Sequence, residues 1–181
     1  DDLDRLREAA ERMAREVEDH VRKLKDLIRR VRERVERHVK KLEDDLKRVK
    51  EEVDRRGDKK VVDKLRRDLE RLRRETEKSK RELEEDLKRA KDESRKTLTR
   101  LRDALERLRE EVKRVEDKGI DKDKVRKVLE DIKRIVDRLE ERIREVDKDL
   151  ERIVRELMKR LDEVNKRLED TVRRLSEEIR R

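Results

Sequence analysis

Apolar residues recur along this chain at helical spacing, and one stretch repeats its whole pattern. Residues 20–37 read HVRKLKDLIRRVRERVER and residues 38–55 read HVKKLEDDLKRVKEEVDR, so that His20 aligns with His38. Eighteen residues make five turns of an α-helix at 3.6 residues per turn, so each residue returns to the same direction around the helix axis. Such a helix keeps its apolar stripe straight, whereas a strict seven-residue repeat would force a left-handed supercoil.

The same periodicity continues to the end of the chain and predicts three helices, over about 2–56, 59–117 and 122–180. In the first, the apolar seam keeps a mean spacing of roughly 3.5 to 3.6 residues, which indicates little or no supercoil. In the other two, apolar columns repeat every eighteen residues. They include Leu65, Leu83 and Leu101, and Val128, Val146 and Val164.

Two glycines separate the predicted helices. Gly57 and Gly119 suit the left-handed conformation just past a helix end, and Asp58 and Asp121 are good N-cap residues for the helix that follows. The turns at 57–58 and 119–121 are so short that consecutive helices must run antiparallel. We therefore predict an all-α fold, a single-chain up-down-up three-helix bundle of long, nearly straight helices that forms one domain over residues 1–181.

Eight polar residues interrupt the apolar seams and are predicted to form two buried layers. Each short turn fixes which residues of two consecutive helices lie at the same level, because the numbers of two such residues have a constant sum. The sum is roughly 115 for the first two helices and roughly 238 for the last two. The first layer then contains His20, Ser94, Thr97 and Asp147, and the second contains His38, Thr76, Ser79 and Asn165. A third copy of the same level is apolar, with Val112, Val115 and Leu129.

We interpret the two layers as buried hydrogen-bond networks in which each histidine uses both ring nitrogens. A buried polar group without a partner costs about 1–3 kcal/mol, so a complete network is tolerated while a shifted register is penalised. The alternative that His20 and His38 turn toward solvent at the seam edge remains open. If they are buried and neutral, stability falls as pH drops through about 6.5, although Asp147 would oppose this for His20.

The composition narrows the possible functions further. The chain has 64% charged residues, a net charge of +9, and no aromatic residue, proline or cysteine. Such charge often accompanies disorder, but the helical spacing of the apolar residues argues against it.

Basic and acidic residues alternate and no aromatic side chain could stack on a base, so we expect no specific nucleic-acid binding. No apolar run approaches the roughly 18 residues of a membrane span and no signal-peptide pattern opens the chain, so we expect a soluble protein of undetermined localisation.

The sequence predicts no catalytic residue, no cofactor and no metal site. The two histidines are five turns apart, about 27 Å along a helix, whereas a transition-metal site would gather more imidazole or carboxylate ligands at one point. General acid–base catalysis by His20 with Asp147 would need a pocket, which a narrow bundle lacks. The tripeptide at 56–58, known from integrin ligands, is interpreted as a helix stop followed by a cap.

The chain resembles the de novo designed helical bundles built from parametric backbones, in particular the straight class based on an eighteen-residue, five-turn unit. The resemblance covers the whole chain. It rests on the phrase at 20–55, the apolar columns, the two glycine turns and a surface made almost wholly of Lys, Arg, Glu and Asp. It implies an idealised, very stable scaffold with no native substrate. We expect a monomer that requires no partner; the alternative is a helical interaction protein that self-associates or docks a partner helix, with a pH response through its histidines.

Overall fold

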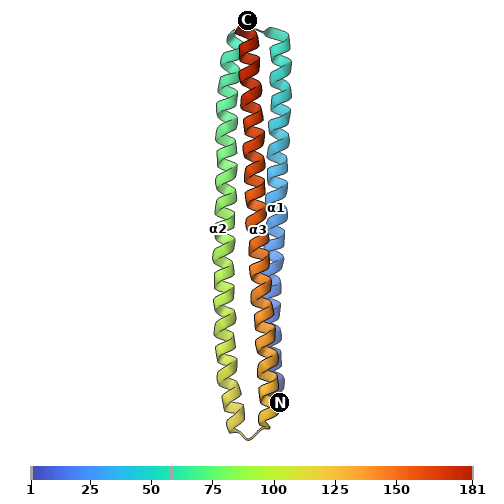
Figure 1. The fold of residues 1–181 in the computed structure, drawn as a ribbon, viewed down its shortest axis with the longest axis vertical. Helices are drawn as coiled ribbons and strands as arrows, with labels where there is room; N and C mark the ends of the chain where they lie inside the picture. Colours follow the sequence, from blue (N-terminus) through green and yellow to red (C-terminus); the bar gives the residue numbers. More distant parts are fainter. Residues whose placement is uncertain (1, 58, 181) are drawn as a thin grey trace. The chain divides into compact units, whose positions relative to one another are not determined.

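The structure of the protein is a computed structural model that describes residues 2–57 and 59–180. It consists of helices α1 (Asp2–Arg56), α2 (Lys59–Asp117) and α3 (Lys122–Arg180), and the described residues contain no strand (Figure 1). The predicted all-α class with three helices is confirmed, and the helices begin and end within the expected ranges. Asp58, expected to cap α2, lies outside the described residues.

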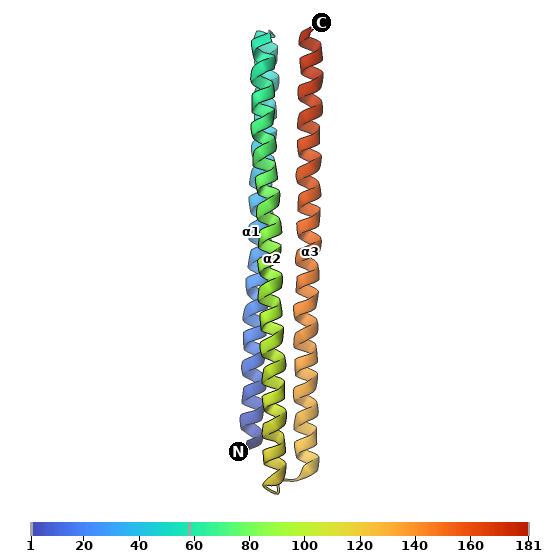
Figure 2. The same cartoon turned by 90° about the vertical axis from the view of Figure 1, so that its left-hand side faces the viewer.

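The chain divides into two compact units, and each contains a part of every helix. The first unit comprises Asp1–Leu27 and Lys88–Leu150, and the second comprises Ile28–Leu87 and Glu151–Arg181. Within each unit the three helical segments lie side by side (Figures 1 and 2). The organisation of residues 1–181 as one domain remains a prediction.

Ion pairs between helices show how the segments run within each unit. In the first unit, Arg102 on α2 pairs with Glu140 on α3 at 3.5 Å, and Arg142 on α3 pairs with Glu18 on α1 at 3.1 Å. With Ser94 bonded to Asp147, rising numbers on α2 meet falling numbers on α3, so these two segments are antiparallel.

The second unit repeats this arrangement. Lys80 on α2 pairs with Asp162 on α3 at 2.8 Å, and Arg73 pairs with Glu169. Between α1 and α2, Lys64 pairs with Glu52 at 2.8 Å. The antiparallel direction of α2 in both units follows from its short connections.

Contacts between α2 and α3 are displaced slightly from the expected level. The residue numbers sum to 242 for Arg102 with Glu140 and for Lys80 with Asp162, rather than to roughly 238. Side chains on a helix lean toward its N-terminus. When two helices are antiparallel, this lean brings together residues that each lie further toward the C-terminus of their own helix, nearer the turn on α2 and further from it on α3. Both residue numbers rise, and so does their sum.

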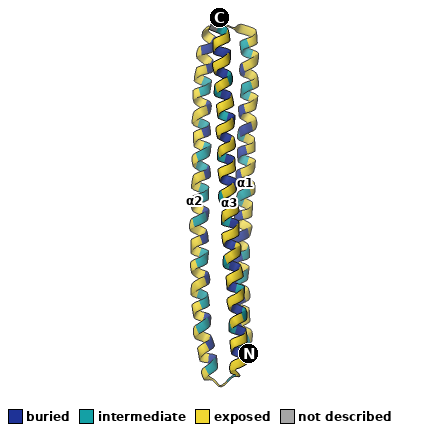
Figure 3. Cartoon of the chain, in the orientation of Figure 1, coloured by how far each residue is buried: buried dark blue, intermediate teal, exposed yellow. Residues whose placement is uncertain are grey.

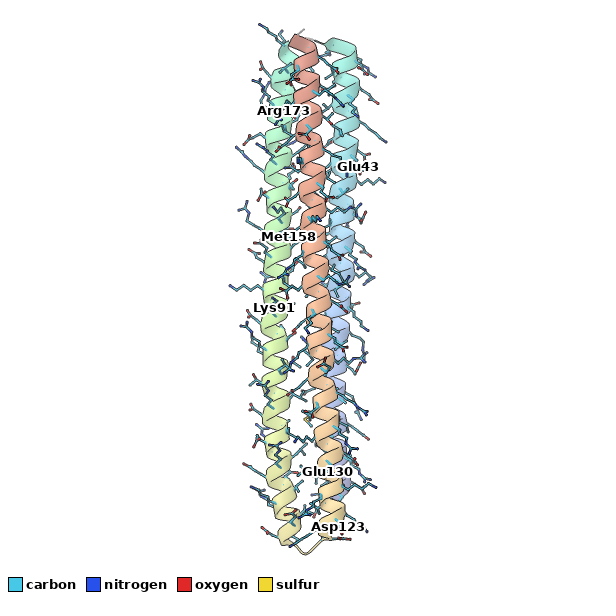
Figure 4. All side chains as sticks on the ribbon, in the orientation of Figure 1. Glu43, Lys91, Asp123, Glu130, Met158 and Arg173 are labelled. Atoms are coloured by element: carbon cyan, nitrogen blue, oxygen red, sulfur yellow. The ribbon has the colours of Figure 1, made fainter. Side chains whose placement is uncertain are left out.

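The apolar seams form the cores of the two units, as the recurring buried positions in Figure 3 show. In the second unit, the partly buried Val53 and Leu69 pack against a buried cluster. The cluster comprises Val49, Val61, Leu65, Val172 and Leu175. Burying one such side chain contributes about 1.5–3 kcal/mol. None of the described large hydrophobic residues is exposed, and charged side chains such as Glu43 and Arg173 cover the outside (Figure 4).

Both glycines adopt the positive φ that the turns require. Gly57 has φ 41° and donates from its N–H group to the Val53 carbonyl at 3.1 Å, and Gly119 has φ 84° and donates to the Glu116 carbonyl at 3.1 Å. At the start of α3, the Asp121 carboxylate accepts a hydrogen bond from the Asp123 N–H at 3.1 Å. This bond satisfies one of the free N–H groups of the first helical turn.

Candidate functional site: two buried polar layers

The first polar layer joins all three helices of the first unit. His20 on α1 and Ser94 on α2 are 8% and 1% exposed, and Asp147 on α3 is half-buried. Each occupies a seam position, so helical periodicity alone directs it into the core. Apolar neighbours in sequence, including Val17, Val21, Ala90, Val146 and Leu150, are buried around the layer.

The direction of the hydrogen bonds in this layer follows from the atoms that can donate. The Ser94 hydroxyl donates to Asp147 Oδ1 at 2.6 Å, and His20 Nε2 lies 2.8 Å from Ser94 Oγ. A hydroxyl has one proton and an ionised carboxylate has none, so Ser94 must accept the bond from His20. The histidine is therefore the Nε2–H tautomer, and the bonds run from α1 through α2 to α3.

The second layer has the same histidine bond but a different continuation. His38 Nε2 lies 3.2 Å from Thr76 Oγ1, and the Thr76 hydroxyl donates to the Leu72 carbonyl of its own helix at 2.9 Å. Thr76 is 1% exposed, while His38 and Asn165 are half-buried. Asn165 Oδ1 is buried without a hydrogen-bond partner among the described residues. The bonds of this layer thus connect α1 with α2 and stop short of α3.

The structure does not bring Thr97 and Ser79 into these bonds. Both are half-buried; the Thr97 hydroxyl donates to the Glu93 carbonyl at 3.0 Å, and the Ser79 hydroxyl takes no part in the bonds of His38 and Thr76 among the described residues. Each lies three residues after the hydroxyl that bonds the histidine, which places it about 60° away around the helix. That angle moves both residues from the centre of the seam to its edge. Within the described part of the chain, both histidines also bond through Nε2 alone.

Three further polar features of the second unit were not predicted from the sequence. Arg34 Nη2 donates to Asp86 at 2.9 Å while its buried Nε has no hydrogen-bond partner, and Asp45 Oδ2 is buried without one. Ser176 on α3 is also buried. Arg34 and Asp45 each directly precede a seam residue, Val35 or Leu46, and this adjacency is the signal that could have indicated their partial burial.

Burial governs the protonation of both histidines. Removal of water lowers the pKa of His20 below its usual 6.5, against the opposing effect of Asp147 and Glu93. Burial likewise lowers the pKa of His38, against Glu75 and Glu82 and with a smaller lowering from Lys41. The lowered pKa values favour the neutral form of both side chains at pH 7, and a neutral histidine with its proton on Nε2 makes both observed bonds.

These lowered pKa values predict a loss of stability on acidification. Below about pH 6.5, His20 and His38 are protonated in the unfolded chain but still neutral in the folded protein. The free energy of unfolding therefore falls as the pH drops, until the pH reaches the pKa values of the folded state. Thermal unfolding measured from pH 7.5 to 5 should give a larger drop in Tm for this chain than for a variant with both His20→Leu and His38→Leu. Parallel curves for the two proteins would contradict the expectation.

The hydrogen-bond order of the first layer differs from that of a hydrolytic triad, although serine, histidine and aspartate are all present. In a triad, histidine lies between the other two and takes the proton of serine. Here Ser94 lies in the middle, gives its proton to Asp147 and faces the N–H of His20. With this order His20 has no lone pair directed at the Ser94 hydroxyl.

The described residues contain neither a cluster of metal ligands nor a membrane-spanning helix. Among residues 2–57 and 59–180, no three His, Cys, Asp or Glu side chains are grouped so that they could hold a metal ion. None of the helices in this part of the chain combines the length and apolar character that crossing a membrane requires.

Comparison with known proteins relates the chain to designed bundles. No protein-family model matches the sequence, and no curated protein matches it. A solved structure described as a computationally designed three helix bundle has a TM-score of 0.61 with this chain, with 25% identity over 98% of this chain and 79% of that one. The protein is thus a three-helix bundle similar to a computationally designed one, and its resemblance to de novo designed helical bundles is confirmed.

Proposed function

We propose that the protein is a designed structural scaffold, a monomer whose residues 1–181 form one domain and whose polar layers fix the register of the helices. The bonds from His20 through Ser94 to Asp147 are the observation that carries this proposal. They connect three helices at one level of the first unit, whose other buried residues in the described range are apolar. No substrate, cofactor or partner is required for this role.

In this role the polar layers fix the register because hydrogen bonds left unmade are costly. Moving α2 by one turn would place the Ser94 hydroxyl against apolar side chains and break its bonds to His20 and Asp147. A buried polar group left unpaired costs about 1–3 kcal/mol, and more when it is charged. Apolar contacts alone discriminate less, because one Leu or Val replaces another at modest cost.

The surface favours a scaffold over the alternative of an interaction protein. A chain that self-associates or docks a partner helix would present a continuous exposed apolar stripe. No large hydrophobic side chain is exposed in the described part of this chain. The exposed positions are occupied mainly by charged residues of both signs, which favour a dispersed monomer.

Light scattering and an apolar-layer variant test the proposal together. We expect a mass near 22.4 kDa at all concentrations. The variant with His20→Leu, Ser94→Ala and Asp147→Leu should remain helical and at least as stable, but should show more than one set of backbone amide peaks as other registers become populated.

A matched control changes apolar neighbours of the same layer. The variant with Leu101→Met and Leu150→Met replaces two buried residues by ones of similar volume and should keep a single set of peaks. A mass that rises with concentration, or a single set of peaks in the apolar-layer variant, would exclude the proposed role.

A further inference from the structure

The two polar layers are equivalent in register. Residue numbers sum to 114 for His20 with Ser94 and for His38 with Thr76. They sum to 241 for Ser94 with Asp147, and the residue of α3 that gives the same sum with Thr76 is Asn165. Asn165 therefore has the same position relative to Thr76 as Asp147 has relative to Ser94.

Two ion pairs support this placement within the second unit. Lys80 pairs with Asp162 and Arg73 pairs with Glu169. Thr76 lies between the two basic residues on α2, and Asn165 lies between the two acidic residues on α3. The side chains of Thr76 and Asn165 are thus held at one level from both sides.

The hydroxyl protons of the two layers point in different directions. Ser94 donates across the core to α3, whereas Thr76 donates to the Leu72 carbonyl of its own helix. A threonine within a helix readily makes this bond to the carbonyl four residues earlier. Thr76 already accepts the Nε2–H of His38, and its oxygen has one lone pair left to offer.

A residue that faces a lone pair must supply a proton, and this requirement distinguishes asparagine from aspartate. An ionised aspartate only accepts, but asparagine carries two N–H groups. Asn165 Oδ1 is buried without a hydrogen-bond partner among the described residues, and the hydroxyl at the same level, that of Thr76, gives its proton to the Leu72 carbonyl. A half-turn of the amide group exchanges Oδ1 and Nδ2, two atoms of nearly the same size.

We propose that Asn165 is the hydrogen-bond donor of the second layer, with its Nδ2–H group directed to Thr76 Oγ1. The inference rests on the proposed scaffold function and specifies how the second layer selects its partner on α3. The layers then have opposite polarity: α3 accepts in the first and donates in the second. The eighteen-residue repeat gives the two layers the same pattern of apolar neighbours. The opposite direction of the hydrogen bond to α3 is what distinguishes one layer from the other.

A double-mutant cycle between Thr76 and Asn165 tests the assignment. At pH 8, where both histidines are neutral, Asn165→Asp should raise the unfolding equilibrium constant about tenfold or more, because a carboxylate would face a lone pair. Thr76→Ser alone should change it less than about threefold. The double variant should recover most of the loss, because a serine hydroxyl can turn toward the carboxylate as Ser94 does. An Asn165→Asp variant as stable as the parent, or no recovery in the double variant, would overturn the proposal.

The side-chain amide protons of Asn165 give a direct measurement. One of the two should exchange with water about tenfold more slowly in this chain than in a Thr76→Val variant, which keeps the branched shape and removes the acceptor oxygen. Equal exchange in the two proteins would also overturn the assignment.

Light scattering and amide spectra on the same samples separate this inference from the scaffold proposal. The double-mutant cycle or the exchange measurement could fail while the parent chain keeps a mass near 22.4 kDa and a single set of backbone amide peaks. In that case the donor role of Asn165 is wrong and the scaffold proposal stands. A mass that rises with concentration contradicts the scaffold proposal whatever the cycle gives. Expected results in the cycle and the exchange together support the donor role.

Discussion

Replacing Leu65 by alanine is expected to lower the free energy of unfolding by about 2–5 kcal/mol, the range for truncating a fully buried leucine. Leu65 is 0% exposed and packs in the cluster that includes Val49, Val61, Val172 and Leu175. The cluster draws on α1, α2 and α3, so the space left by the side chain cannot be filled by moving one residue. Because alanine is at least as good a helix former as leucine, the loss reports packing. Denaturant unfolding followed by circular dichroism measures it.

Two companion variants make this measurement specific. Arg66→Ala changes the next residue, which is exposed, and should stay within about 0.5 kcal/mol of the parent. Leu65→Met keeps most of the volume and should cost less than about 1.5 kcal/mol. If Leu65→Ala were no more harmful than Arg66→Ala, the described core of the second unit would be wrong.

The second large effect is expected from Ser94→Ala, which should lower the free energy of unfolding by about 1–3 kcal/mol. The substitution removes the acceptor of His20 Nε2–H and the donor to Asp147 Oδ1 in one step. The bond to a carboxylate is the stronger of the two. Alanine favours the helix slightly more than serine does, so the measured loss is a lower limit for the hydrogen bonds.

Thr97→Ala is the matched control for Ser94→Ala, because Thr97 lies one turn further along α2 and its hydroxyl bonds to the Glu93 carbonyl of the same helix. It should change the free energy of unfolding by no more than about 0.5 kcal/mol. Equal losses in the two variants would show that Ser94 contributes no more than a helix-surface hydroxyl.

The helices were predictable because their signals are local. An eighteen-residue repeat keeps the apolar residues of 20–55 on one face through ten turns, and this requires no knowledge of the partner helices. Gly57 and Gly119 ended two helices for an equally local reason, since only a residue without a side chain adopts positive φ at little cost. The bounds at Arg56, Lys59 and Asp117 follow from these residues.

The first polar layer was predictable in position and only partly in chemistry. The positions of the two turns predicted that His20, Ser94 and Asp147 meet, and the structure contains the two bonds that join them. The same positions could not exclude Thr97, because a difference of 60° around the helix separates the centre of a seam from its edge.

By itself the sequence determined the three helices, their turns, the apolar faces and the levels at which polar residues meet, because all of these follow from helical period and chain connectivity. The tertiary structure decided which hydroxyl gives its proton to which acceptor. Ser94 bonds across to Asp147, while Thr76 bonds back to Leu72. That choice depends on side-chain rotamers and on atoms of other helices within about 3 Å, and no periodic pattern along the chain encodes it.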